Sequence, residues 1–256
     1  MKTLYVIAAA GGLAMAAGFA FKSQHSTAPI VAQPVDLPAA EPAAAPAVLE
    51  LFTSQSCSSC PPADALAQQL AQREDVIVIS RPVTYWNRIG WEDTLSSEDN
   101  TDLQRAYARR GLDGRNGVYT PQIVVDGRSG VVGSRTGDVT DLLQNALGRT
   151  RPSIAVSDDG QVTINGAASS SARLSIVAVD ASETVSIAAG ENRNRTVTYT
   201  NSWLGEDAIG VWTGGEASFA LPAILPEQSR ADRHVLILRE QRADGAGTVL
   251  AGRWLS

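Results

Sequence analysis

Histidine, methionine and cysteine are scarce in this 256-residue chain, which has two of each. Met1 and Met15 lie in the N-terminal segment, and His25 and His234 are far in sequence from both cysteines. A Cys–His nucleophile pair needs a nearby imidazole, and a zinc or copper site on two thiols needs further soft or imidazole ligands. This scarcity disfavours hydrolases and metal chaperones, and we expect no metal and no other cofactor.

Basic residues are also few, with 21 Lys and Arg against 27 Asp and Glu and a net charge of −6. Nucleic acids and anionic membrane surfaces attract basic stretches, and the chain has no such stretch. We therefore expect neither as a partner. The sequence also has no internal repeat, no phosphate-binding glycine loop and no serine nucleophile elbow.

The first 22 residues have the pattern of an export signal. Lys2 precedes an uncharged run over residues 3–21, and Lys22 follows it. Such a run is a signal peptide or an N-terminal membrane anchor, since its length is close to that needed to span a bilayer. Residues 23–46 are rich in Ala and Pro and predict a linker. We expect export, in a bacterium to the periplasm, either secreted or tethered to the inner membrane.

Cys57 and Cys60 lie where an apolar strand-like run, residues 48–52, leads into a helix-like run over residues 63–73. Two thiols at this spacing close a disulfide with little backbone movement, and the positive end of the helix dipole stabilises a thiolate. Outside the cytosol such a pair rests as a disulfide unless something reduces it. The pattern favours a redox-active dithiol. A static disulfide, or two reduced thiols in a core, is the alternative.

Residues 47–150 alternate strand-like and helix-like segments and predict an α/β domain. The apolar run 76–79 predicts an internal strand, so the first three elements form a β-α-β unit with the cysteines beyond the carboxyl edge of its sheet. A second helix is expected over 97–110. A hairpin through 118–133 and a last helix over 136–147 complete the domain.

Residues 151–256 have a different pattern, with short segments of alternating apolar and polar residues separated by turns rich in Asp, Gly, Asn and Ser. This pattern predicts a smaller all-β domain that resembles a sandwich. His234 begins an apolar run and is interpreted as a strand-end histidine, and the polar run 191–195 as a solvated loop. We expect no ligand at either position.

The α/β half resembles the thioredoxin fold in its order of strand, C-x-x-C, helix, strand, helix, Thr-Pro hairpin and closing helix. More closely, residues 49–55, 57–64, 119–122 and 125–127 are similar to the exported thioredoxin-like family catalogued as domain of unknown function 1223. The resemblance covers most of the chain from Val48 to the C-terminus. It implies a fold and a candidate dithiol site, because the function of the family itself is uncharacterised.

The thioredoxin pattern implies a role for each matched residue. Cys57 would be the attacking thiol and Cys60 the resolving thiol. Pro121 would be the cis proline that faces the disulfide, and it would leave the backbone of Thr120 free to pair with an extended substrate. Glu50, an acid in an apolar strand, is a candidate for the buried acid that moves the proton of the resolving cysteine, although its spacing is one residue longer.

The chain departs from thioredoxin around the cysteines. Ser58 and Ser59 replace the usual Gly-Pro, and the two prolines at 61 and 62 restrict where the helix begins. Residues 85–116 form an insertion that carries Tyr85, Trp86 and Trp91 near its start. These aromatic residues predict either a binding wall, with Trp86 in contact with substrate, or ordinary packing.

Two functions fit these observations. The leading hypothesis is an exported thiol–disulfide oxidoreductase in which Cys57 exchanges with a protein or small-molecule disulfide and Cys60 resolves the adduct. The alternative is a non-enzymatic envelope binding module in which the Cys57–Cys60 disulfide is structural. The sequence leaves open the substrate, the direction of electron flow and the oligomeric state.

Overall fold

The computed structural model describes residues 45–115, 117–223 and 231–255. The predicted signal peptide or anchor, residues 1–22, and all but the last two residues of the predicted linker, 23–46, lie outside this part of the chain. No helix among the described residues has the length and apolar character needed to cross a membrane.

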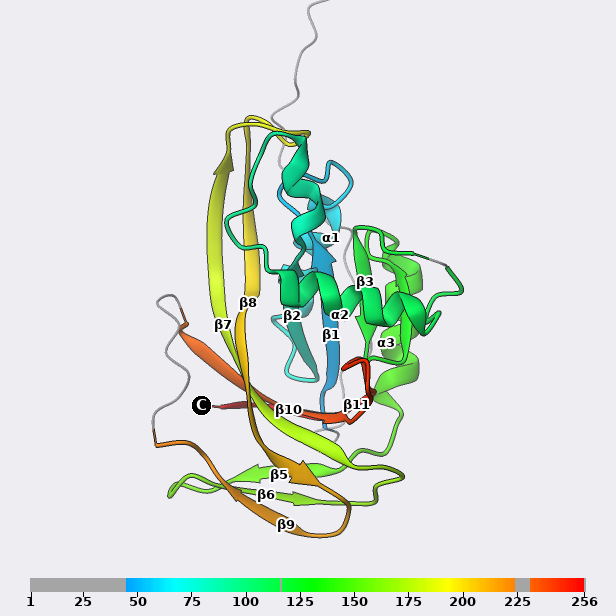
Figure 1. Cartoon of the computed structure of the whole chain (residues 1–256), viewed down its shortest axis with the longest axis vertical. Coiled ribbons are helices and arrows are strands. Elements are labelled where there is room, and N and C mark those ends of the chain that lie inside the picture. The colour runs from blue at the N-terminus through cyan, green and yellow to red at the C-terminus, as the bar shows by residue number, and fades with distance from the viewer. Residues whose placement is uncertain (1–44, 116, 224–230, 256) are drawn as a thin grey trace, which may run out of the picture.

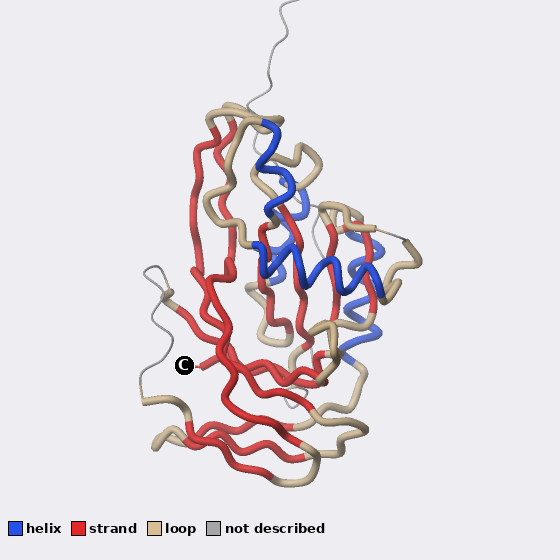
Figure 2. Tube along the Cα trace, in the orientation of Figure 1, coloured by secondary structure: helices blue, strands red, loops and turns tan. Residues whose placement is uncertain are grey.

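Helices occur only in the first half of the described chain, and the second half consists of strands and turns (Figures 1 and 2). The elements are, in order, β1 (Ala47–Thr53), α1 (Pro61–Leu70), β2 (Val76–Pro82), the 3-10 helix η1 (Thr84–Ile89), α2 (Glu98–Arg109), β3 (Gln122–Val125), β4 (Ser129–Val132), α3 (Thr136–Leu147), β5 (Ser153–Val156), β6 (Gln161–Asn165), β7 (Ala172–Ile187), β8 (Arg195–Trp212), β9 (Ala217–Ala220), β10 (Arg233–Glu240) and β11 (Val249–Leu255).

These strands form a mixed sheet of eight, in the order β11-β10-β7-β8-β2-β1-β3-β4, and an antiparallel sheet of three, in the order β5-β6-β9. β1 and β2 run parallel and are joined through α1, as the β-α-β reading predicts. β3 pairs antiparallel with the other side of β1. The cysteine turn therefore leaves the carboxyl end of a central strand.

The alternation of side chains along β1 decides which groups face which helix. Leu49 and Leu51 pack into one core with α1 and α3. Val48 and Phe52 point to the opposite face, where Phe52 packs with Tyr107 of α2. One face of the sheet is thus covered by α1 and α3, and the other by α2 (Figure 1).

The second half of the chain does not form a separate sandwich. The predicted boundary near residue 150 falls between α3 and β5, but four strands beyond it, β7, β8, β10 and β11, continue the sheet of the first half. The join is a parallel pairing of β8 with β2, at Ser202 and Ser80. Without β8, the outer edge of β2 would present unpaired backbone groups, which proteins avoid. The three-stranded sheet packs against the far end of this large sheet.

Candidate functional site

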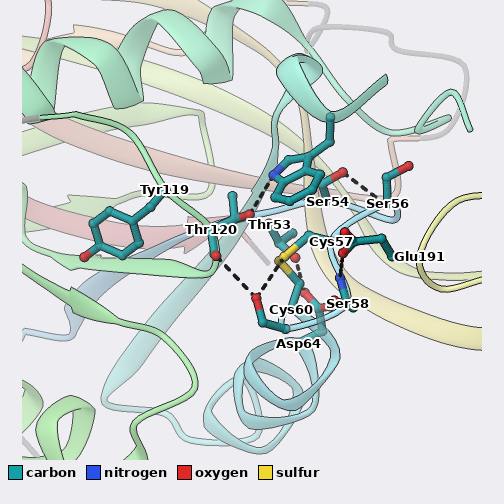
Figure 3. Close-up of a disulfide and its surroundings, with 12 residues drawn as sticks. Thr53, Ser54, Ser56, Cys57, Ser58, Cys60, Asp64, Tyr119, Thr120 and Glu191 are labelled. Atoms are coloured by element: carbon teal, nitrogen blue, oxygen red, sulfur yellow. Dashed lines mark hydrogen bonds between the residues drawn. A yellow bond between two sulfur atoms is a disulfide. The ribbon is translucent and has the colours of Figure 1, made fainter. Parts of the chain in front are cut away.

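Cys57 and Cys60 form a disulfide where the chain enters α1, with their Cα atoms 5.4 Å apart (Figure 3). Cys60 is the N-cap residue, and prolines occupy the first two helical positions, where a backbone N–H donor is not required. Both cysteine side chains are 0 % exposed, whereas Ser58 and Ser59 between them are exposed. In the oxidised protein the sulfur atoms therefore lie beneath the turn that carries them.

The segment before β3 lies beside this turn. The Thr120–Pro121 peptide bond is cis. The hydroxyl of Ser59 lies 3.5 Å from the carbonyl oxygen of Thr120 and 3.3 Å from the sulfur of Cys57. The indole N–H of Trp86 donates to the hydroxyl of Thr120 over 2.8 Å. The structure thus brings Thr120 to the cysteine turn (Figure 3). Trp86 lies there too through its hydrogen bond to Thr120, and both residues are predicted as substrate contacts.

Glu50 does not occupy the place that the resemblance implies for it. Its carboxylate accepts hydrogen bonds from Arg81 (2.7 Å), Arg239 (2.9 Å) and the hydroxyl of Tyr107 (2.6 Å). Burial alone raises the pKa of Glu50, but the two guanidinium groups and the Tyr107 hydroxyl outweigh it and lower the pKa to about 2. Glu50 therefore remains a carboxylate, and its hydrogen bonds link β1 to β2, β10 and α2. Its side chain lies on the face of β1 opposite to that of Thr53. It is unsuited to accept the proton of Cys60.

A buried acid does lie near Cys60, and it is Asp64. Its backbone N–H donates to the carbonyl of Cys60 (3.1 Å), so the two residues are one helical turn apart and share a face of α1. The hydroxyl of Thr53 donates to one carboxyl oxygen over 2.7 Å, and the other oxygen is buried with no hydrogen-bond partner among the described residues. Burial raises the pKa of Asp64 to about 8, against the opposing effect of the Thr53 hydrogen bond.

The sequence contained the signal for this carboxyl group. Asp64 closes the cysteine motif, residues 57–64, and lies four positions after Cys60, which is the spacing of neighbours on a helix face. The prediction instead took the acid from β1, where Glu50 points away from α1. Thr53, three residues later, points toward α1 and bonds to Asp64.

Further polar side chains extend this buried layer. Asp93 accepts the backbone N–H groups of Gln55 (2.8 Å) and Leu95 (2.9 Å), and burial raises its pKa. The hydroxyl of Tyr199 on β8 is buried, with no hydrogen-bond partner in the described chain. Burial raises the pKa of Tyr199, and the negative charges of Asp64 and Asp93 raise it further. The interior side of the disulfide is therefore an acidic and weakly hydrated environment.

The loop between β7 and β8 closes over the cysteine turn, although the sequence predicted a solvated loop there. The carboxylate of Glu191 accepts the backbone N–H of Ser58 over 3.0 Å (Figure 3). The side-chain amide of Asn192 donates to the carbonyls of Gln55 (2.9 Å) and Cys57 (2.8 Å). These contacts join residues more than 130 positions apart in the chain, which single-sequence patterns do not report.

Comparison with known proteins gives the family. The family described as protein of unknown function (DUF1223) matches residues 48–239. The chain belongs to this family. The resemblance to this family over residues 49–55, 57–64, 119–122 and 125–127 is thereby confirmed.

Two solved structures resemble this DUF1223 protein. Protein AGR_C_4864 from Agrobacterium tumefaciens is 32 % identical and aligns over 83 % of this chain and 94 % of its own, with a TM-score of 0.69. HBP35 of Porphyromonas gingivalis is 14 % identical over 83 % of this chain and 75 % of its own, with a TM-score of 0.52, which is a likeness of fold alone. No curated protein matches the chain.

A cavity of about 760 Å³ lies beside α2, on the face of the eight-stranded sheet that α2 covers. Arg81, Trp203 and Arg239 are among the residues that line it, and none of the residues predicted for the dithiol site does. Within the described ranges, no group of three or more His, Cys, Asp or Glu side chains is placed to hold a metal ion.

Proposed function

We propose that this protein is an exported thiol–disulfide oxidoreductase whose first half is a thioredoxin-like unit. The observation that carries the proposal is the pairing of a helix-start disulfide with a buried carboxyl group one turn below Cys60. The approach of the Thr120 carbonyl oxygen to the Ser59 hydroxyl of the cysteine turn supports the same proposal. The proposal of export rests on the sequence pattern of residues 1–22, and an exported dithiol would meet an oxidising environment.

The proposed exchange passes two electrons from the dithiol to a substrate disulfide. The thiolate of Cys57 attacks one substrate sulfur, and the other leaves as a thiolate that takes a proton from water. The Cys60 thiol gives its proton to the carboxylate of Asp64, and the resulting thiolate attacks the sulfur of Cys57. The Cys57–Cys60 disulfide forms, and the second substrate sulfur leaves as a thiolate that also takes a proton from water. The reverse sequence oxidises a substrate dithiol.

Asp64 suits the proton transfer better than Glu50 because of its acidity. A group that accepts and returns protons works best when its pKa lies near the working pH. The pKa of Asp64, raised to about 8, meets this condition near neutrality, whereas the pKa of Glu50 is about 2. One carboxyl oxygen of Asp64 has no hydrogen-bond partner among the described residues and leaves a position open for the proton.

Trapping of the mixed disulfide tests the proposal. The reduced Cys60→Ser variant, mixed with oxidised glutathione, should accumulate a glutathione adduct on Cys57, because the attacking thiol remains and the resolving thiol is gone. Cys57→Ser is the matched control and should form far less adduct under the same conditions. Intact-protein mass spectrometry measures both. If Cys60→Ser forms no more adduct than Cys57→Ser, the oxidoreductase assignment fails.

A second function is favoured by one specific observation, the full burial of both cysteines under a turn held by Asn192. This arrangement is typical of a structural disulfide, and the protein would then be a binding module of the cell envelope. The reduction potential separates the two functions. A value below about −300 mV indicates a structural bond, and a value between about −120 and −270 mV is that of working oxidoreductases.

A further inference from the structure

The loop between β7 and β8 places a negative charge on the cysteine turn. Glu191 is exposed, and its carboxylate accepts the backbone N–H of Ser58, the residue directly after Cys57 (Figure 3). Hydrogen bonds from the side chain and backbone of Ser58 lower the pKa of Glu191, so the group is a carboxylate at neutral pH. Within the described chain Glu191 forms no salt bridge.

The position of this charge is fixed by the neighbouring residues. Asn192 is fully buried and donates to the carbonyls of Gln55 and Cys57. Gly190 has a φ of +75° and lies so close to the turn that a Cβ atom there would be 3.3 Å from the hydroxyl oxygen of Ser56. A glycine thus allows both the backbone conformation and the close approach. The loop is held at the cysteine turn rather than free in solvent.

Two electrostatic effects therefore oppose each other at Cys57. Backbone N–H groups at a helix start stabilise a thiolate. Ser58 lies in the turn before the helix, where Glu191 occupies its backbone N–H and places a negative charge at the residue that follows Cys57. Charged or titratable groups on the other neighbouring elements include Asp64 on α1, Asp93 in the loop before α2, Tyr199 on β8, and Arg195, which donates to the side chain of Asn192.

We propose that Glu191 is a positioning residue of the dithiol, which disfavours the Cys57 thiolate and thereby makes the disulfide harder to reduce. The proposal concerns the same site as the oxidoreductase function and rests on it for its biological meaning. A protein with this device is a weaker oxidant, or a stronger reductant, than the same dithiol without the loop. The class of reaction it fits is the reduction of substrate disulfides by the dithiol.

Glu191→Gln tests the proposal, because glutamine keeps an oxygen to accept the Ser58 N–H and removes only the charge. In the Cys60→Ser background Cys57 is the single thiol, and the ultraviolet absorbance of its thiolate gives the titration midpoint without any need for solvent access. We expect Glu191→Gln to lower this midpoint by about one pH unit, the size of a like-charge effect at the edge of a protein.

The second readout is the equilibrium of the complete dithiol with glutathione. A stabilised thiolate favours the reduced form, so at a pH above both midpoints the variant disulfide should be reduced about tenfold more readily, which equals about 30 mV. Glu216→Gln is the matched control. It removes the same charge in the turn before β9, at the opposite end of the molecule from the cysteine turn (Figure 1).

An unchanged or higher midpoint in Glu191→Gln would overturn the proposal, as would an equal shift in Glu216→Gln. Neither measurement depends on turnover of a substrate. If the midpoint falls in Glu191→Gln alone while Cys60→Ser forms no glutathione adduct, the inference about Glu191 stands and the oxidoreductase function fails. If the adduct forms and the midpoint does not move, the function stands and the inference fails.

Discussion

Replacement of Asp64 by asparagine should stabilise the oxidised protein, and the gain should grow with pH. Asparagine has nearly the same size and keeps an oxygen that accepts the hydroxyl of Thr53, but it cannot ionise. Asp64 is 3 % exposed, and one of its carboxyl oxygens has no hydrogen-bond partner in the described chain. Ionisation of such a group costs free energy that is not recovered from the surroundings.

The size of the effect follows from the pKa values in the two states. The pKa of Asp64 rises from 3.8 to about 8 on folding. Below pH 4 the carboxyl group is protonated in both states and costs nothing. Between about pH 4 and pH 8 the unfolded chain loses the proton first, so the free energy of unfolding falls by about 1.4 kcal/mol per pH unit. By pH 7 the free energy of unfolding has therefore fallen by about 4 kcal/mol relative to its value below pH 4.

Urea unfolding of the disulfide-bonded protein at several pH values measures this loss. Wild type and Asp64→Asn should have similar free energies of unfolding near pH 4, and the variant should gain several kcal/mol by about pH 8. Asp141→Asn, which removes an exposed carboxylate on α3, is the matched control and should show little change. The reasoning is refuted if the gain of Asp64→Asn is independent of pH, decreases as pH rises, or equals that of Asp141→Asn.

The remaining predictions concern the groups around the site. Glu50→Gln should lower the free energy of unfolding at pH 7 by about 3–5 kcal/mol, because Arg81 and Arg239 would keep buried charges without their carboxylate; an unchanged urea midpoint would contradict this. Since the pKa of Glu50 is lowered to about 2, its ionic contribution in the wild type should be complete above about pH 4.5 and should decline as the pH falls to 2 and below, which acid titration of circular dichroism can follow. Asn192→Ala should cost about 1–3 kcal/mol in the same urea assay and should speed reduction of the disulfide by dithiothreitol, since two buried carbonyls lose their donor; equal reduction rates would argue against the loop as a cover.

Local pattern was enough to predict the start of the fold and the position of the cysteine pair at a helix start. The apolar run 48–52, the cysteine pair and the helical spacing after it are all read within about 25 residues, and the structure has β1, the disulfide and α1 there. The resemblance of residues 49–55, 57–64, 119–122 and 125–127 to the DUF1223 family is also confirmed, over residues 48–239. Neither result required knowledge of a distant contact.

The strand pairing of the second half was not predicted, because it depends on contacts between residues far apart in the sequence. β7 and β8 are 16 and 18 residues long, but register shifts and exposed polar positions break their alternation, so the sequence predicted shorter strands. Nothing in the local pattern indicates that β8 pairs with β2, because that edge is satisfied by residues more than 100 positions away. The predicted separate sandwich was therefore wrong at the level of topology, although the segments are strands.

The amino-acid sequence by itself determined that two thiols meet at a helix start, since their spacing and the following helix are local properties. The tertiary structure decided what surrounds them. Glu50 faces two arginines because the pleat of β1 and the positions of β2 and β10 place it there, and Asp64 becomes the weak acid because the fold excludes water from it. Glu191 and Asn192 reach the cysteine turn only because the long β7–β8 hairpin joins the sheet beside β2. Acidity and access depend on burial and on charges contributed by distant segments, so they are properties of the assembled fold rather than of any stretch of sequence.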